Sequence, residues 1–270
     1  MRILTPLILG SFFLLLYMAL LASSDPVVRY LHYVPRDWPA SAPSQRLVLL
    51  SDTHVSGPDT PPERLDRVVA MVNSLGPDIV LLAGDYISTK TLATRYYSLV
   101  EAIRPLAAIR TSQGVVAVLG NHDHWANATS ARRALHRAGV RLLDNDATRL
   151  GPIALGGVDD DFTNRADLVA VAGKLSTLGG VPVLLSHSPD VFAYAPGWIG
   201  LVVAGHTHCG QIVLPWLGAI ATASRYGQRY RCGVIRDGRR TMIVTAGIGT
   251  SIMPLRLGAR PDLWVIDVGR

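Results

Sequence analysis

Short hydrophobic runs that end abruptly in polar residues recur along the chain. They occupy residues 47–50, 79–82, 115–119, 183–185 and 201–204. Each run lacks the alternation of a half-exposed strand, so it predicts a strand covered on both faces. The polar residues that follow predict loops at the carboxyl edge of a sheet, where open α/β sheets bind their ligands.

Between these runs, hydrophobic residues recur with the spacing of amphipathic helices. The helical segments cover residues 65–75, 92–109, 131–138 and 168–175. Short β-like segments at residues 142–155, a hairpin around Asp237-Gly238 and a strand at residues 263–266 add an antiparallel part. The alternation of buried strands with helices predicts an α/β fold.

The amino terminus is the most hydrophobic stretch, because residues 3–22 carry no charge. Its length suits a helix that spans a bilayer, and we expect a transmembrane anchor over residues 1–24. A signal peptide cleaved near Ala22-Ser23-Ser24 is the alternative. The prolines that follow predict an extended linker over residues 25–45, ahead of one domain over residues 46–270.

The composition is that of a folded protein with one large core. The chain has 270 residues, of which 49% are hydrophobic and 17% charged, and this excludes disorder. A net charge of +6 favours anionic partners such as phosphorylated substrates or an acidic membrane surface. The basic residues form no recognisable nucleic-acid module, so we expect no nucleic-acid partner.

The two cysteines, Cys209 and Cys232, are too few for a disulfide framework and leave the compartment open. Cys209 directly follows the His-x-His motif of residues 206–208 and could be a soft metal ligand. A small buried residue is the favoured interpretation.

Residue types that bind metals follow the predicted strands directly. They are Asp52, His54, Asp85, Asn121, His122, His187, His206 and His208. Any one of them could cap a helix or form a turn. Parallel strands gather their carboxyl ends along one edge, however, and unrelated caps would not all use metal-binding residues. The pattern therefore predicts a metal site at that edge.

The ligand set mixes carboxylate, amide and imidazole groups and lacks a thiolate pair, which indicates catalytic divalent metals such as Mn, Fe, Zn, Co or Ni. The set is larger than one ion needs. Two ions that share Asp85 would use all of it, and paired ions are suited to activating water for an in-line displacement at phosphorus.

The order Asp-x-His, Gly-Asp, Gly-Asn-His-Asp, His and Gly-His-x-His resembles the calcineurin-like metallophosphoesterase superfamily. The resemblance implies a four-layer α-β-β-α sandwich with mixed sheets. It also implies that the first metal is held by Asp52, His54, Asp85 and His208, and the second by Asp85, Asn121, His187 and His206. By the same resemblance, His122 would stabilise the transition state or protonate the leaving oxygen.

One position departs from the resemblance. Many members read Gly-Asp-x-x-Asp, where the second aspartate orients the catalytic histidine, but this chain has Ser88 there. Asp123 or an acid of residues 159–161 could take over this role, although a capping or solvated turn is the favoured interpretation of the triplet.

Fuller phrases at residues 185–190, 204–211 and 247–256 resemble the membrane-associated bacterial branch, which includes phosphodiesterase-like enzymes and UDP-2,3-diacylglucosamine hydrolases of lipid A synthesis. Arg256 could clamp a phosphate with its planar guanidinium, a surface arginine being the alternative.

We therefore expect a hydrolase of a phosphodiester or pyrophosphate bond in a lipid-linked substrate, with UDP-2,3-diacylglucosamine as the first guess. We expect an inner-membrane or cell-membrane protein with a single amino-terminal span. That substrate requires a cytoplasmic domain; the extracytoplasmic side stays open. The alternatives are a general membrane-anchored phosphodiesterase or phosphatase and a non-catalytic metal-binding scaffold. The oligomeric state is left open.

Overall fold

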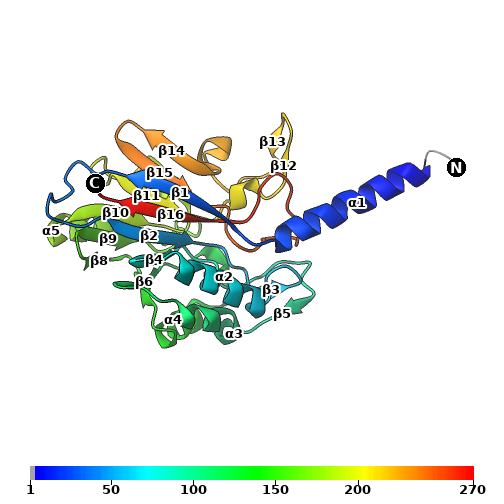
Figure 1. Ribbon diagram of the computed structural model, residues 1–270, viewed down its shortest axis with the longest axis horizontal. Helices are drawn as coiled ribbons and strands as arrows, with labels where there is room; N and C mark the ends of the chain where they lie inside the picture. The colour runs from blue at the N-terminus through cyan, green and yellow to red at the C-terminus, as the bar shows by residue number, and fades with distance from the viewer. Residues whose placement is uncertain (1–3) are drawn as a thin grey trace.

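The computed structural model describes residues 4–270, with a long helix that projects from an α/β domain (Figure 1). This helix, α1 (Leu4–Ser23), is long and apolar enough to cross a membrane. Most of its leucines and phenylalanines are exposed. Among residues 6–23, whose side chains the structure describes, only Met18 and Ala22 are buried, at the end that meets the domain. The expected apolar helix at the amino terminus is confirmed.

Two six-stranded sheets form the centre of the domain. The first contains, in spatial order, β1 (Val27–Tyr33), β16 (Asp262–Val268), β2 (Gln45–Leu50), β4 (Ile79–Leu82), β6 (Gly114–Ala117) and β7 (Arg141–Leu142). The second contains β14 (Gly233–Asp237), β15 (Arg240–Val244), β11 (Leu201–Ala204), β10 (Val181–Leu185), β9 (Ile153–Gly157) and β8 (Asp146–Leu150).

Both sheets are mixed, as expected. The strands β2, β4 and β6 run parallel, whereas β16 is antiparallel to β2. In the second sheet β9, β10, β11 and β15 run parallel, and the edge strands β8 and β14 are antiparallel to their neighbours. The central strands are buried on both faces, which explains why their sequences are continuous hydrophobic runs.

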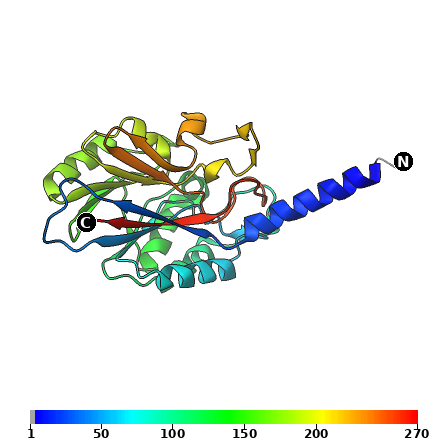
Figure 2. The ribbon, with the colours of Figure 1, turned by 45° about the horizontal axis from the view of Figure 1, so that its top comes forward.

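Three hydrophobic clusters define four layers. One cluster fills the space between the two sheets, with Leu49, Leu81 and Val203 among its members. A second joins the first sheet to the helices α2 (Pro62–Ser74), α3 (Leu99–Ile103) and α4 (Asn121–Arg137). The third joins the second sheet to α5 (Leu168–Leu178). Helices therefore cover the outer faces of both sheets (Figure 2), and the expected α-β-β-α sandwich is confirmed.

The expected linker is partly wrong. Residues 27–33 form the edge strand β1, which pairs in parallel with β16, and Arg29 Nε lies 2.6 Å from Asp262 Oδ2. The prolines nearest this segment, at positions 26 and 35, lie outside the strand, so every residue within it can donate to the ladder. Residues 34–44 are irregular.

The expected helix at residues 92–109 is broken into shorter elements. Residues 95–96 form β5 (Arg95–Tyr96), which pairs with β3 (Ser56–Gly57). The helix α3 then begins at a capping box of Ser98 and Glu101 and passes directly into the 3-10 helix η1 (Arg104–Ala108). Pro105 lacks an amide proton and cannot continue the α-helical ladder, which explains the early end of α3.

A small hairpin of β12 (Val213–Leu214) and β13 (Gly218–Ala219) lies beside the base of α1 (Figures 1 and 2). It belongs to an irregular segment that also contains η3 (His208–Gly210) and η4 (Gly227–Tyr230), while η2 (Pro189–Ala193) follows β10. The segment is closed by a disulfide between Cys209 and Cys232, whose Cα atoms are 4.7 Å apart. The interpretation of Cys209 as a metal ligand is therefore wrong, because its sulfur is used in this bond.

Candidate metal centre

The carboxyl ends of strands from both sheets meet at one site. The loops after β2, β4 and β6 face the loops after β10 and β11, and all the strand-end residues converge there although they lie far apart in the sequence. The buried residues brought together are Asp52, His54, Asp85, Asn121, His122, His187, His206 and His208.

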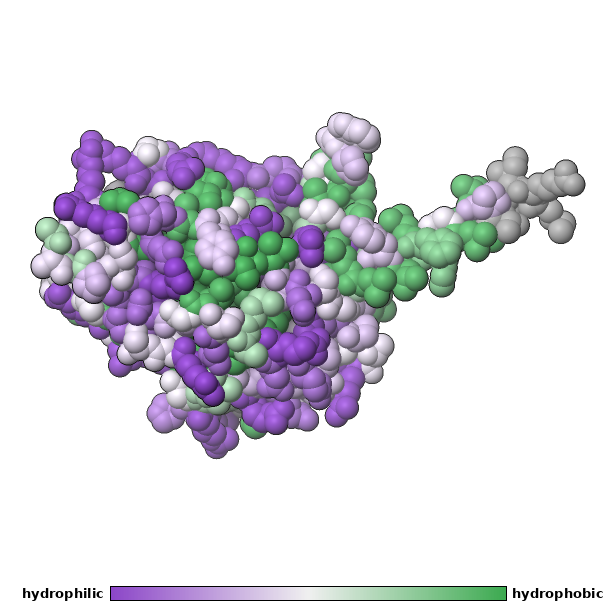
Figure 3. Space-filling model, in the orientation of Figure 1, coloured by the Kyte–Doolittle hydropathy of each residue, from purple (hydrophilic) through white to green (hydrophobic). Residues whose placement is uncertain are grey.

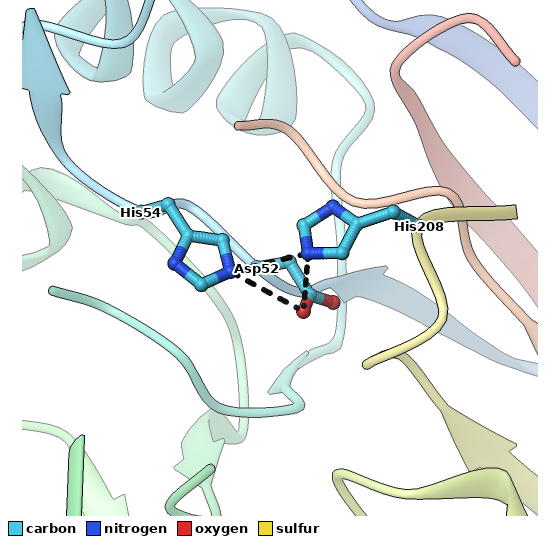
Figure 4. Close-up of side chains that lie close together, drawn as sticks. All are labelled: Asp52, His54 and His208. Carbon is cyan, nitrogen blue, oxygen red and sulfur yellow. Dashed lines mark hydrogen bonds and ion pairs between the residues drawn. The ribbon is translucent and has the colours of Figure 1, made fainter. Parts of the chain in front are cut away.

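Asp52, His54 and His208 form the first cluster (Figure 4). The Nε2 atoms of His54 and His208 are 3.1 Å apart, and Asp52 Oδ1 lies 3.4 Å from His208 Nε2 and 3.8 Å from His54 Nε2. Two ring nitrogens and one carboxylate oxygen therefore point at a common centre.

Asp85, His187 and His206 form the second cluster, with Asn121 beside it. His187 Nε2 is 3.3 Å from Asp85 Oδ2, 3.0 Å from Asn121 Oδ1 and 3.0 Å from His206 Nδ1. The same Asp85 Oδ2 lies 3.4 Å from His54 Nε2. Asp85 thus lies between the two clusters, as a shared ligand would.

The protonation equilibria of three histidines and one carboxylate suit cation binding. Burial lowers the pKa of His206 to about 4 and lowers the pKa values of His54 and His208 well below the usual range. These rings are therefore neutral and offer lone pairs. Burial opposes ionisation of Asp85, but His187 and His122 outweigh it and hold the pKa of Asp85 well below its usual range. His187 differs: burial disfavours its charged form, but the Asp85 carboxylate outweighs this and raises the pKa of His187 well above its usual range, so a bound cation would displace the proton of His187.

The donor groups of the site fit divalent metal ions. Asp52 Oδ1 and His206 Nε2 are buried and have no hydrogen-bond partner among the described residues. Leaving such groups unpaired is costly, and a metal ion would satisfy both. The facing Nε2 atoms of His54 and His208 can share one hydrogen bond, and a cation between them would allow both to act as acceptors. Oxygen and imidazole donors match the catalytic metals expected from the sequence.

Outer hydrogen bonds orient two of the imidazoles. His187 Nδ1 lies 2.7 Å from the carbonyl oxygen of Ala83, and His54 Nδ1 lies 3.3 Å from that of Ile87. A carbonyl only accepts, so each Nδ1 donates, and Nε2 is the nitrogen that faces the centre.

The backbone at the site adopts conformations that non-glycine residues rarely take. Positive φ angles occur at Asp52, His54, Asp85, His206 and His208. Such angles cost free energy and persist where the surrounding structure imposes them, often at functional sites. The tight turns also require glycine, since a Cβ on Gly120 would collide with the carboxylate of Asp85 and one on Gly205 with Ser51.

Thr89 fills the place that the sequence left open beside His122. Its Oγ1 is 2.6 Å from His122 Nδ1, whereas Ser88 Oγ accepts a hydrogen bond from the amide of Lys90. The role of Thr89 as the partner of His122 was not predicted from the sequence. The available signal was a hydroxyl residue one position after the expected aspartate, in the same loop.

The acids proposed as replacements have other partners. Asp123 accepts hydrogen bonds from the backbone amides of Asp85, Tyr86 and Gly120, and so braces the turn that carries Asp85. The triplet after β9 is also used elsewhere: Asp159 contacts His124, Asp160 accepts from the amide of Thr163, and Asp161 contacts Tyr194 and Arg225. The prediction that Asp123 or an acid of residues 159–161 orients His122 is therefore wrong.

Arg256 is buried beneath the site and does not line the cavity described below. Its guanidinium donates to the carbonyl oxygens of Ala246 at 2.7 Å, Gly249 at 2.5 Å and Ala259 at 3.1 Å. These bonds hold the loop before β16 in shape. The role of phosphate clamp is therefore wrong for Arg256, because the side chain is fully buried and both terminal amino groups donate to the backbone.

A cavity of about 540 Å³ opens over the centre. Its polar floor includes Asp85, Asn121, His122, His206 and His208. Its walls are largely apolar and include Trp125, Phe162, Ile212, Ile220, Ile252 and Met253. The Trp125 ring centroid lies 4.8 Å from that of His122, and the Phe162 centroid 4.6 Å from that of His206. The cavity can therefore hold an anionic group on its floor and an apolar group against its walls.

Comparison with known proteins agrees with this geometry. A family profile described as calcineurin-like phosphoesterase matches residues 45–210, which include the metal-binding clusters. The chain is 30% identical over 230 residues to the uncharacterized metallophosphoesterase YkuE of Bacillus subtilis, with 83% of this chain and 78% of YkuE covered.

Two further relatives have informative names. The transmembrane protein with metallophosphoesterase domain of Danio rerio is 31% identical over 244 residues, with 83% of this chain and 53% of that protein covered. The chain thus spans about half the length of that relative. Phosphodiesterase YaeI of Escherichia coli is 28% identical over 259 residues, with 88% of this chain and 92% of YaeI covered.

Proposed function

Because the chain belongs to the calcineurin-like phosphoesterase family, it is a metal-dependent phosphoester hydrolase, and we propose that its substrate is a phosphodiester or pyrophosphate carried by a membrane lipid. One observation carries this proposal: the cavity over the metal-binding clusters has a polar floor and largely apolar walls. We also propose that α1 anchors the protein in a membrane, which α1's length and composition and the name of the Danio rerio relative support.

The proposed ligand sets divide the centre into two metal sites that share Asp85. They are Asp52, His54, Asp85 and His208 for the first ion and Asp85, Asn121, His187 and His206 for the second. Bound ions supply Lewis acidity, which activates water and offsets charge at phosphorus. The identity of the metals stays open among Mn, Fe, Zn, Co and Ni.

His122 is the proposed catalytic residue. Its ring lies on the cavity floor, with Nε2 4.0 Å from Asp85 Oδ2 and Nδ1 against Thr89. Nδ1 faces a hydroxyl that can hold the ring in place, so Nε2 is free to donate a proton to the leaving oxygen or to stabilise charge on the phosphoryl group.

The substitution His122→Ala tests this role. We expect turnover of a phosphodiester to fall by about a hundredfold or more while the metal content stays intact. His136→Ala, an exposed histidine on the same helix, is the matched control and should leave turnover unchanged. Unchanged turnover in His122→Ala would remove this residue from the mechanism.

Substrate class is tested by comparing a vesicle-borne lipid phosphodiester with a water-soluble aryl phosphodiester, both with Mn added. A lipid hydrolase should have the higher kcat/KM on the vesicle-borne compound. Equal values would favour the alternative, a general phosphodiesterase or phosphatase that α1 merely localises.

The side of the membrane decides whether UDP-2,3-diacylglucosamine remains a possible substrate. That nucleotide sugar is made in the cytoplasm, whereas the disulfide between Cys209 and Cys232 favours an oxidising compartment. We therefore propose the extracytoplasmic side, opposite to the expectation from the sequence. A reporter fused after Arg270 that is active only inside the cell would overturn this assignment and restore the nucleotide sugar.

A further inference from the structure

Two uncharged segments expose large hydrophobic side chains next to α1. Residues 211–224 and 246–255 contain no charged residue. The exposed fractions are 103% for Trp216, 79% for Leu217, 70% for Ile220 and 66% for Ile252. We call these four residues the apolar rim. Contiguous exposed apolar surface usually marks an interaction site.

The loop that carries Ile252 is fixed to α1 within the apolar part of the helix. The backbone amide of Arg256 donates to the carbonyl oxygen of Met18 at 3.1 Å. Met18 precedes the helix end at Ser23 by five residues, or about 7.5 Å at 1.5 Å per residue. If α1 spans a bilayer up to its end, this loop lies at the depth of the membrane interface.

The β12–β13 hairpin is attached to the same loop. Val213 N donates to Leu257 O at 2.8 Å, Leu257 N donates to Gln211 O at 2.9 Å, and the Gln211 side chain donates to Met253 O at 3.0 Å. The hairpin and the loop therefore form one unit at the base of α1. Figure 3 shows hydrophobic residues gathered where α1 meets the domain.

We propose that the apolar rim inserts into the interface of the bilayer that α1 crosses. The proposal rests on the membrane anchoring proposed above. Three features select a bilayer as the occupant: the loop that carries Ile252 is hydrogen-bonded to α1, the two segments are uncharged, and a fully exposed tryptophan lies in the hairpin, as is typical of interfacial belts.

The position of the rim gives the cavity a lipid-facing mouth. Ile220 and Ile252 belong both to the rim and to the cavity wall, whose floor is the metal centre. A lipid phosphoester can therefore slide its apolar part along these side chains while its phosphate reaches His122. The substrate reaches the active site without leaving the bilayer.

Fluorescence quenching in proteoliposomes tests the insertion directly. The full-length protein is reconstituted in phosphatidylcholine vesicles with or without bromine on the acyl chains. Brominated lipid should quench a component of the tryptophan emission that Trp216→Phe lacks. The matched control is Trp198→Phe, an exposed tryptophan just before the start of β11, at the strand end away from the centre, which should retain that component. Equal quenching of the wild type and Trp216→Phe would overturn the proposal.

Activity supplies a second and separable test. Replacing Trp216 and Leu217 with Asp should lower kcat/KM on a vesicle-borne phosphodiester by about tenfold or more, because two apolar side chains no longer insert. Turnover of a soluble aryl phosphodiester should stay unchanged, which also shows that the variant folds. An equal loss on both substrates would overturn the rim's role. A wild type inactive on both substrates would contradict the proposed function, while the quenching result would still decide the insertion.

Discussion

Thr89 is a neutral partner for His122, the proposed catalytic residue. Carboxylate partners increase the basicity of an imidazole, whereas a hydroxyl orients the ring without adding charge. Here the 2.6 Å contact between Thr89 Oγ1 and His122 Nδ1 fixes the ring while Asp85 remains the nearest acid, at 4.0 Å from Nε2. A hydroxyl in place of a carboxylate adds no negative charge to a site that already contains aspartates and imidazoles.

The substitution Thr89→Val should lower kcat by about tenfold with unchanged metal content, since it removes only the hydroxyl that holds His122. Thr89→Ser should restore most of the rate because it retains the hydroxyl. Ser88→Ala is the matched control in the same loop. Equal effects of Thr89→Val and Ser88→Ala on kcat would assign Thr89 a merely structural role.

The clustering of the candidate metal ligands could be predicted from the sequence, because their position directly after hydrophobic runs is local information. Thr89 and the apolar cavity walls could not, because their roles depend on which distant loops meet. For Arg256 the sequence led to a wrong prediction. Its planar guanidinium suggested a phosphate clamp, but the side chain is buried and donates to backbone carbonyl groups. Residue type alone does not reveal whether a donor is already paired.

Among the elements, the buried parallel strands were the easiest to predict, because burial on both faces leaves a continuous hydrophobic signal. The edge strand β1 lacks that signal, since its burial pattern mixes exposed and half-buried positions. The break in the helix at residues 92–109 depends on the pairing of β5 with β3, a long-range contact. The disulfide likewise joins positions that only the folded segment brings together.

A buried ion pair joins the Thr89 loop to the elements at the base of α1. Lys90 Nζ lies 2.6 Å from Asp59 Oδ1 and 2.9 Å from Thr250 Oγ1, and Asp59 also accepts from Thr250. Asp59→Asn should lower the free energy of unfolding by about 3–5 kcal/mol, because Lys90 is left as a buried charge without its counterion.

Chemical denaturation measures this effect. Asp66→Asn is the control: Asp66 pairs with Arg104 at 4.0 Å on the surface, and its loss should cost about 1 kcal/mol or less. A similar cost for the two variants would mean that the buried pair contributes no more than a surface pair.

The disulfide between Cys209 and Cys232 closes the segment that follows His208. Cys232→Ser should lower the free energy of unfolding by about 2–4 kcal/mol, because the unfolded chain loses a constraint between positions 23 residues apart. Thiol titration of the denatured wild type should detect no free thiol, and a reductant should lower its Tm as the substitution does. Two titratable thiols in protein purified from membranes would contradict the extracytoplasmic assignment.

At the scale of the whole molecule, the metal centre joins the two sheets. The segments that follow β2, β4 and β6 of the first sheet supply Asp52, His54, Asp85 and Asn121. Those that follow β10 and β11 of the second sheet supply His187, His206 and His208. The loss of the ions should therefore weaken the packing of one half of the sandwich on the other.

Chelation should lower the Tm and abolish phosphodiester turnover, and added Mn should restore both. Binding to the folded state alone stabilises by about 2.7 kcal/mol when the free metal is a hundred times its Kd. The measurement is a thermal melt at several metal concentrations. A Tm that does not change with metal concentration would mean that the centre is held by the protein fold alone.

Only residues 24–26 separate α1 from β1, and Arg64 also donates to the carbonyl oxygen of Ser24. If α1 anchors the protein as proposed, the domain is therefore held rigidly at the membrane and not by a flexible linker. A domain held in this way keeps the opening of its cavity at a fixed depth and meets substrate by diffusion within the membrane. Its turnover rate should then follow the mole fraction of substrate in its own leaflet and not the bulk concentration. Dilution of the substrate with inert lipid would slow it, while dilution of the vesicles in buffer would not.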